Sequence, residues 1–331
     1  MRQRRRKQRL MFGGGLLLVA VVFTAILLLL SSKGCGPSKA EDGEVEAVPS
    51  AEATEEPTAE PTPTAEPVPS VDISDINSQT GILVRLSDGE VVAEKDADAK
   101  IYPASMTKIM TAIVGLENLS DLNETITIDR DMYDRLYTEG ASLAGFGAGD
   151  EVKAIDILYG VMLPSGAECC VGLAQHLFGS EENFVAKMNE KAAELGMDST
   201  HFVTCTGLHD ENHYTTPYDI YLMLKEALKY PEFTEITQLP SYTVTFQHSD
   251  GSEDSVSLTA TDHYLTGEAN APKGVTVLGG KTGTTSSAGN CLALLCQNSY
   301  GEPYVSIVMG ASTKELLYQQ MTSLLENINT V

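Results

Sequence analysis

The segment 36–70 limits the fold of this chain most strongly, because it holds seven of the 14 prolines, many glutamates and alanines, and no aromatic residue. Such a segment cannot bury enough apolar surface to offset the conformational entropy lost on folding. We therefore expect an extended, disordered linker over 31–70, in which TAEP occurs twice without forming a structural repeat. Ordinary globular composition resumes at residue 71, so one folded domain is expected over 71–331.

An uncharged apolar run, LMFGGGLLLVAVVFTAILLLL, precedes this linker at 10–30. A transmembrane helix needs about 20 such residues, whereas the apolar core of a cleaved signal peptide, the alternative, usually has about 7–15. The segment 1–9 carries five arginines, one lysine and no acid. We therefore expect a transmembrane anchor at 10–30 that keeps the basic tail in the cytoplasm and puts 71–331 on the extracytoplasmic side.

The charge balance excludes one class of partner. The chain has a formal net charge of −24, and six of its 22 basic residues lie in 1–9, which leaves 16 against 46 acidic residues for the remainder. A surface of this sign repels nucleic acid, so no nucleic-acid binding is expected. The six cysteines include no paired C-x-x-C motif, and Cys169, Cys170, Cys291 and Cys296 are expected to be buried free thiols.

Hydrophobic periodicity predicts the elements of 71–331. A β-hairpin is expected from 81–86 and 90–95 around a Ser-Asp-Gly turn, with further strands at 241–246, 275–285, 290–298 and 304–312. Helices are expected from residue 104, over 152–178 with a break at 164–166, and over 180–197, 215–230 and 313–328. This order predicts an α+β fold, in which the first and last strands form one antiparallel sheet and the helical block packs against it.

A serine and a lysine stand three residues apart in YPASMTKIMTA, at the start of a largely apolar helix. A serine hydroxyl is a poor nucleophile unless a neighbouring base takes its proton. Lysine serves as that base when burial and a second cation lower its pKa. The pair therefore predicts Ser105 as nucleophile and Lys108 as general base. The alternative is a capping serine beside a surface lysine.

Two further short motifs follow in the chain, S-G-A at Ser165–Ala167 and K-T-G at Lys281–Gly283. Ser165 is expected to relay a proton to a leaving amine, a role that is compatible with capping the following helix. Lys281 is a candidate for the second cation, and Thr282 offers a hydroxyl to a carboxylate.

Backbone groups of the same segments complete the predicted site. Gly283 lets the backbone of a substrate approach the strand closely. The N–H groups of Ser105 and Thr284 are expected to form an oxyanion hole.

Five stretches in this order resemble the serine D-alanyl-D-alanine carboxypeptidases, a peptidase S11-like family of low-molecular-mass penicillin-binding proteins. They are SDGEVVAEKDADAKIYPASMTKIMTA, GVMLPSGAECC, TGLHDENHYTTPYDI, GGKTGTTSSAGNCLAL and VMGAS. The resemblance covers essentially all of 71–331 and implies a β-lactamase/transpeptidase-like fold. It implies that a stem peptide of peptidoglycan ending in D-Ala-D-Ala acylates Ser105 with Lys108 as base and Ser165 in the proton shuttle. Lys281 and Thr282 would hold the terminal carboxylate, and β-lactams would acylate Ser105.

The chain departs from the family pattern in two ways. The middle motif is usually Ser-x-Asn, whereas Ala167 stands here in place of an amide that would bind substrate and help to place Lys108. Turnover, or the preference among stem peptides, is therefore expected to differ. Many relatives also continue into a second, β-rich domain with an amphipathic C-terminal helix, and we expect the N-terminal anchor to replace that tether.

Features of the sequence suggest three alternative functions: a metal-dependent enzyme, a β-lactamase and a sensor. His209 and His213 stand four apart, like metal ligands, but they lie in a loop without H-E-x-x-H or an evident third ligand, so no metal and no cofactor is expected. A β-lactamase needs a deacylating glutamate, and no convincing E-x-x-x-N follows the middle motif. A slowly turning-over penicillin or muropeptide sensor stays open because of Ala167. The protein is expected to be a monomer that is bound to the membrane by its anchor.

Overall fold

A computed structural model describes residues 71, 73 and 76–329 of the chain. The chain divides into the units 1–69 and 70–331, and the expected basic tail, anchor and linker lie outside the described residues. Within 71, 73 and 76–329, no helix combines the length and the apolar character needed to span a bilayer.

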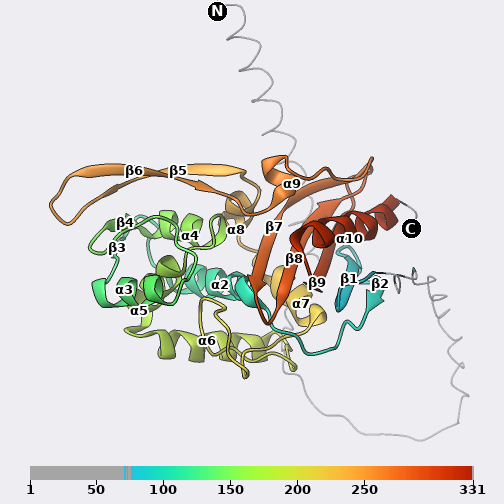
Figure 1. Ribbon diagram of the computed structural model, residues 1–331, viewed down its shortest axis with the longest axis horizontal. Helices are drawn as coiled ribbons and strands as arrows, with labels where there is room; N and C mark the ends of the chain where they lie inside the picture. Colours follow the sequence, from blue (N-terminus) through green and yellow to red (C-terminus); the bar gives the residue numbers. More distant parts are fainter. Residues whose placement is uncertain (1–70, 72, 74–75, 330–331) are drawn as a thin grey trace, which may run out of the picture. The chain divides into compact units, whose positions relative to one another are not determined.

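A five-stranded antiparallel sheet forms the centre of the domain, with the strand order β2-β1-β9-β8-β7 (Figure 1). The strands are β1 (Thr80–Arg85), β2 (Val91–Lys95), β7 (Thr276–Thr285), β8 (Gly289–Gln297) and β9 (Pro303–Ala311). The N-terminal hairpin therefore pairs with the three C-terminal strands, since β1 lies beside β9 from Thr80↔Met309 to Arg85↔Tyr304. This confirms the predicted sheet.

Both faces of the sheet are buried, which explains the continuous apolar run CLALLC in β8. Leu292 and Leu294 pack with α10 (Lys314–Glu326), which crosses this face in Figure 1. Cys291 and Ala293 point to the opposite face and join the core of the helical block. Each face thus receives alternate residues of the strand.

The helical block lies on that second face. It contains α2 (Lys108–Asn118), α3 (Arg130–Thr138), α4 (Ala154–Met162), α5 (Ala167–Phe178), α6 (Glu181–Glu194), α7 (Pro217–Ala227) and α8 (Pro231–Thr237). The short helices α9 (His263–Thr266) and η2 (Asn327–Asn329) pack with α10 on the first face. Helix α2 is buried from Lys108 to Gly115. The helices expected at 180–197 and 215–230 begin where the sequence indicates, because the side chains of Ser180 and Thr216 accept hydrogen bonds from the first-turn N–H groups.

A second antiparallel sheet, with the order β3-β4-β5-β6, covers the helical block, and its long β5–β6 hairpin runs along the upper edge of Figure 1. Its strands are β3 (Thr125–Thr127), β4 (Glu151–Lys153), β5 (Ser241–Gln247) and β6 (Glu253–Thr259). Only β5 was predicted. The helix expected from residue 152 begins at Ala154, because its first residues belong to β4.

The segment expected to be helical from residue 104 begins with a 3₁₀ turn, η1 (Ala104–Thr107), which continues into α2. Ala104 has a left-handed φ of 48° directly after Pro103. The tighter turn places Ser105 beside the end of β7, at the junction of the sheet and the helical block.

Candidate active site

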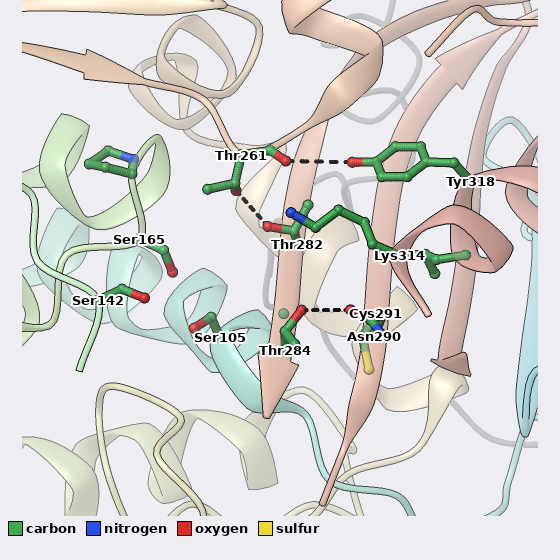
Figure 2. Close-up of a pocket in the computed structure, with 13 residues that line it drawn as sticks. Ser105, Ser142, Ser165, Thr261, Thr282, Thr284, Asn290, Cys291, Lys314 and Tyr318 are labelled. Carbon is green, nitrogen blue, oxygen red and sulfur yellow. Dashed lines mark hydrogen bonds between the residues drawn. The ribbon is translucent and has the colours of Figure 1, made fainter. Parts of the chain in front are cut away.

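A cavity of about 190 Å³ opens between the five-stranded sheet and the helical block. Five of the residues that line it belong to the predicted motifs or directly follow them: Ser105, Ser165, Thr282, Gly283 and Thr284. Figure 2 shows the hydroxyls of Ser105, Ser142 and Ser165 gathered on one wall, opposite β7. The three motifs, spread over nearly 180 residues of sequence, therefore meet at one place.

Ser105 and Lys108 are in contact at the bottom of this wall. The Nζ of Lys108 lies 3.2 Å from the Oγ of Ser105 and donates to the carbonyl oxygen of Thr206 at 2.5 Å. Lys108 is only 2 % exposed, whereas Ser105 is half-buried and lines the cavity. A surface lysine is thereby ruled out, and the geometry suits a base that can reach the hydroxyl proton.

The loop after α6 contacts the turn that carries Ser105 and Lys108. His213 is buried, and its Nε2 lies 2.7 Å from the Oγ1 of Thr107, which in turn donates to the carbonyl of Ala104. The Nδ1 of His213 accepts from the backbone N–H of Val203 at 3.0 Å. An acceptor Nδ1 leaves the proton on Nε2, so neutral His213 donates to Thr107. Burial lowers the pKa of His213 to about 4, which maintains this neutral form.

Ser165 occupies the sharp break between α4 and α5, where its φ is 67°. A left-handed non-glycine residue costs roughly 1–2 kcal/mol, and such strain is held only where the surroundings fix it. Here the N–H of Gly166 donates to Gly160 and the N–H of Ala167 donates to Ser142. The strained turn aims the Ser165 hydroxyl at the cavity (Figure 2).

Lys281 completes a second serine–lysine pair. Its Nζ donates to the Oγ of Ser165 at 3.1 Å and to the carbonyl of Thr282 at 3.0 Å, and its side chain is 1 % exposed. Burial first, and the positive charge of Lys108 second, lower the pKa of Lys281 to about 7. The positive charge of Lys108 therefore acts on the amine of Lys281.

A buried carboxylate stands close to this pair. Asp262 is 3 % exposed, and burial raises its pKa to about 6 despite a hydrogen bond from the N–H of Tyr264 and the charge of Lys281. Its Oδ2 has no hydrogen-bond partner among the described residues. The negative charge of Asp262 in turn raises the pKa of Lys281.

Gly283 sits where β7 touches the 3₁₀ turn. A Cβ atom at this position would lie 2.9 Å from the carbonyl oxygen of Pro103 and 3.1 Å from the backbone nitrogen of Ser105. Any side chain would force the strand and the turn apart. Glycine is thus required by the contact that brings Thr284 next to Ser105, the two residues expected to supply the oxyanion hole.

The sequence does not predict several polar side chains of the cavity, namely Ser142, Thr261, Asn290, Lys314 and Tyr318. The Oγ atoms of Thr261 and Thr282 are 2.5 Å apart, and the Oγ1 of Thr284 lies 3.2 Å from the Oδ1 of Asn290. These unpredicted side chains come from two loops, the start of β8 and the first turns of α10, so no single local motif marks them.

Ala167, the departure from the usual motif, does not line the cavity. It is 2 % exposed at the first position of α5. The side chain presented from this wall is Ser142, whose backbone is held by Ala167 and whose neighbours Ala144 and Gly145 donate to the buried carboxylate of Glu168. The Ser142 hydroxyl therefore stands at this wall beside Ala167.

The remaining candidate ligands do not converge. His213 is engaged as described, and His209 packs edge-on against Tyr102. Throughout the part of the chain that the structure describes, no three His, Cys, Asp or Glu side chains are grouped so that they could hold a metal ion. Cys169, Cys170, Cys291 and Cys296 are buried free thiols, which confirms the prediction, and Cys205 is a fifth.

Comparison with known proteins agrees with this geometry. The model of the peptidase S11 family, described as D-alanyl-D-alanine carboxypeptidase, matches residues 64–313. The chain is 31 % identical over 251 residues to the D-alanyl-D-alanine carboxypeptidase DacF of Bacillus subtilis, covering 75 % of this chain and 61 % of that protein. It is 34 % identical over 221 residues to DacB2 of Mycobacterium tuberculosis, covering 66 % and 70 %. It thus spans about three fifths of DacF.

Solved structures give the same result for the fold. The DD-transpeptidase of Streptomyces K15 superimposes with a TM-score of 0.73 at 27 % identity, over 80 % of this chain and all of that one. Penicillin-binding protein 5 of Haemophilus influenzae gives 0.68 at 26 % identity, over 78 % and 72 %. This chain therefore has the α+β, transpeptidase-like fold and belongs to the peptidase S11 family of D-alanyl-D-alanine carboxypeptidases.

Proposed function

We propose that this protein is a serine D,D-carboxypeptidase that removes the terminal D-alanine from peptidoglycan stem peptides and that β-lactams acylate it. The observation that carries the proposal is the contact between the half-buried Ser105 hydroxyl and the buried Lys108 amine, at 3.2 Å and on the wall of the cavity. Membership of the peptidase S11 family supports the substrate class.

The first half of the reaction forms an acyl-enzyme. Lys108 takes the proton of Ser105 while Oγ bonds to the carbonyl carbon of the penultimate D-alanine. The backbone N–H groups of Ser105 and Thr284 stabilise the oxyanion. The C–N bond then breaks, and the leaving amine of the terminal D-alanine receives a proton through Ser165, which Lys281 holds by a hydrogen bond.

The second half releases the shortened peptide. Water attacks the ester carbon, and the amine base takes one proton of that water. Breaking of the ester bond returns the proton to Ser105 and frees a peptide with a new carboxylate. The net reaction adds one water and yields one D-alanine.

Release of D-alanine from a peptide ending in D-Ala-D-Ala tests this proposal, using the whole chain in detergent and mass spectrometry of the products. We expect release by the native protein, none by Ser105→Ala, and labelling of Ser105 by benzylpenicillin. Release that persists in Ser105→Ala would refute the serine mechanism. Measurement in the presence of a chelator tests the metal alternative in the same assay.

A second candidate is a sensor that is acylated but turns over slowly, and Ala167 favours it because the usual amide is missing. In that case benzylpenicillin labels Ser105, yet no D-alanine is released over many minutes. A fast release of hydrolysed penicillin, with no release of D-alanine, would indicate a β-lactamase instead.

The proposal includes a location. The apolar run at 10–30 and the basic segment 1–9 support a single-pass anchor with the catalytic domain outside the cytoplasm, as a monomer on a linker over 31–70. Protease digestion of intact spheroplasts tests this, since the catalytic domain should be cleaved from outside while the cell remains closed.

A further inference from the structure

One peptide group supplies part of the proposed oxyanion hole. The N–H of Ser105, which is expected to bind the oxyanion, shares a rigid plane with the carbonyl of Ala104. Ser105 is the second residue of η1, and the first N–H groups of a helix have no partner inside it. The direction of this N–H therefore depends on what holds the carbonyl at the other side of the same plane.

Thr107 holds that carbonyl. Its side chain is fully buried, and its Oγ1 donates to the oxygen of Ala104 at 2.8 Å. Ala104 has a left-handed φ of 48°, which a residue with a Cβ atom keeps only where its surroundings fix it. The hydrogen bond from Thr107 is one of the contacts that keep the peptide plane in this strained orientation.

His213 in turn orders the Thr107 hydroxyl. Its Nδ1 accepts from the N–H groups of Val203 and Thr204 at 3.0 and 3.3 Å, so Nε2 carries the proton. Nε2 then donates to the Oγ1 of Thr107 at 2.7 Å. Because the Thr107 hydroxyl has one proton and receives another from His213, its own proton goes to the carbonyl of Ala104. The imidazole thus fixes the direction of both hydrogen bonds.

Backbone contacts enclose the same peptide plane from two sides. A Cβ atom on Gly207 would lie 2.5 Å from the carbonyl carbon of Ala104 and 3.0 Å from the Oγ1 of Thr107. A Cβ atom on Gly283 would lie 3.1 Å from the nitrogen of Ser105, and Figure 2 shows Ser105 beside this strand. The loop therefore presses on the carbonyl and the strand on the nitrogen, and the Thr107 hydroxyl sets the tilt of the plane between them.

We propose that His213 and Thr107 are positioning residues of the oxyanion hole, which act through the Ala104–Ser105 peptide group. The hydrogen bonds run from the imidazole to the Thr107 hydroxyl, then to the carbonyl of Ala104, and the N–H of Ser105 continues them to the oxyanion. Bonds in such a chain polarise one another, so a donor on the carbonyl makes the N–H of the same amide a better donor. The inference rests on the proposed function and names residues that act behind its oxyanion hole.

Thr107→Val removes the hydroxyl and keeps the β-branched shape. We expect the acylation rate constant of Ser105 with benzylpenicillin to fall by about 10- to 100-fold, less than for loss of a whole oxyanion-hole donor, while the dissociation constant of the preceding complex changes less than about threefold. Thr107→Ser, which keeps the hydroxyl, should retain most of the rate. Thr237→Val is the matched control, because this buried threonine also donates to a carbonyl of its own helical turn, that of Phe233 at 2.9 Å, and does not line the cavity.

A vibrational measurement separates positioning from a merely structural role. In the acyl-enzyme formed with benzylpenicillin that carries ¹³C at the lactam carbonyl, the oxyanion hole polarises the ester carbonyl and lowers its stretching frequency. The band should move to higher wavenumber in Thr107→Val, and by less in His213→Phe, where the Thr107 hydroxyl remains. It should stay in place in Thr237→Val. A band at the native position in both Thr107→Val and His213→Phe would overturn the assignment, even if acylation is slow.

The two proposals fail separately. A native protein that benzylpenicillin labels but that releases no D-alanine would overturn only the proposed function, and the carbonyl band would still test the oxyanion hole. Equal rates and equal bands in Thr107→Val and Thr237→Val would overturn only the role of Thr107 and His213. If Thr107→Val does not fold, the band of His213→Phe decides alone. A native protein that benzylpenicillin does not label would refute both proposals.

Discussion

The amine of Lys281 lies 3.1 Å from the hydroxyl of Ser165, and the same amine has a pKa lowered to about 7 by burial and by the charge of Lys108. A protonated Lys281 cannot take up a proton that Ser165 passes on from Ser105. We therefore expect the rate of Ser105 acylation by benzylpenicillin to rise with pH through about 7. A rate that is flat from pH 5.5 to 8.5 would show that Lys281 does not titrate in the reaction.

Asp262 is the buried carboxylate beside Lys281 and Ser165. Replacing it should shift the pH at which the rate of Ser105 acylation rises. The charge of Asp262 raises the pKa of Lys281, so Asp262→Asn removes a stabilising anion and lowers that pKa further. The acid limb of the acylation rate should shift to lower pH. Glu268→Gln, an exposed change outside the cavity, should leave the limb in place.

Lys108→Met tests the general base with a side chain of similar length. Acylation of Ser105 should fall by about 10²- to 10⁴-fold, because no amine remains next to the hydroxyl. The fold should survive, since an apolar side chain of similar length replaces a buried amine. The pKa of Lys281 should rise, because the charge of Lys108 lowers it in the native protein. NMR of ¹³C-labelled lysine checks the last point, and a native-like Lys281 titration would contradict the coupling.

The sequence predicted the sheet and the motifs because their signals are local. The hairpin at 81–86 and 90–95 and the apolar run of β8 are strong strand patterns, and S-x-x-K fixes Ser105 and Lys108 on one turn. The second sheet escaped because β3 and β4 have three residues each, and β6 (EDSVSLT) is mostly polar and exposed. No periodicity marks such strands, which are held by pairing with neighbours distant in sequence.

The lack of a local sequence pattern also explains why several residues of the site could not be predicted. Ser142, Thr261 and Lys314 each contribute one side chain from a different loop or helix start, and only the fold brings them to the cavity. For Lys281 the sequence motif predicts the location but not the contacts of the side chain. Its motif placed it at the site, yet its burial and its bond to Ser165 depend on how β7 packs against the turn before α5. The carboxylate role of Lys281 stays a prediction.

Gly283→Ala should separate the strand from the nucleophile. The added methyl would lie 2.9 Å from the carbonyl oxygen of Pro103 and 3.1 Å from the nitrogen of Ser105, and both are backbone atoms that cannot turn away. We expect at least about a 100-fold loss of acylation and a cost of about 1–3 kcal/mol in the free energy of unfolding. Gly172→Ala is the matched control: its nearest contact would be an ordinary 3.4 Å, so activity should be native. Equal activity in both variants would contradict the close approach.

His213→Phe should destabilise the protein by about 2–4 kcal/mol at pH 7, because it removes the bonds to Thr107 and to the backbone N–H of Val203 from a buried site. The exposed His209→Gln is the control. Burial lowers the pKa of His213 from its ordinary value of 6.5 to about 4 in the folded protein, so between these values the unfolded chain binds more protons. The stability that neutral His213 provides is therefore complete above about pH 6.5 and is lost as the pH falls toward 4.

The difference in free energy of unfolding between the native protein and His213→Phe should thus narrow by about 2–3 kcal/mol from pH 7 to pH 4.5. Asp262 titrates in the opposite sense, since its raised pKa favours the folded state as the pH falls through about 6, but this contribution is common to both proteins and cancels in the difference. Urea denaturation at several pH values measures it. A difference that stays constant or widens toward acid would show that His213 is protonated in the folded protein, and that Thr107 and the turn bearing Ser105 are held in another way.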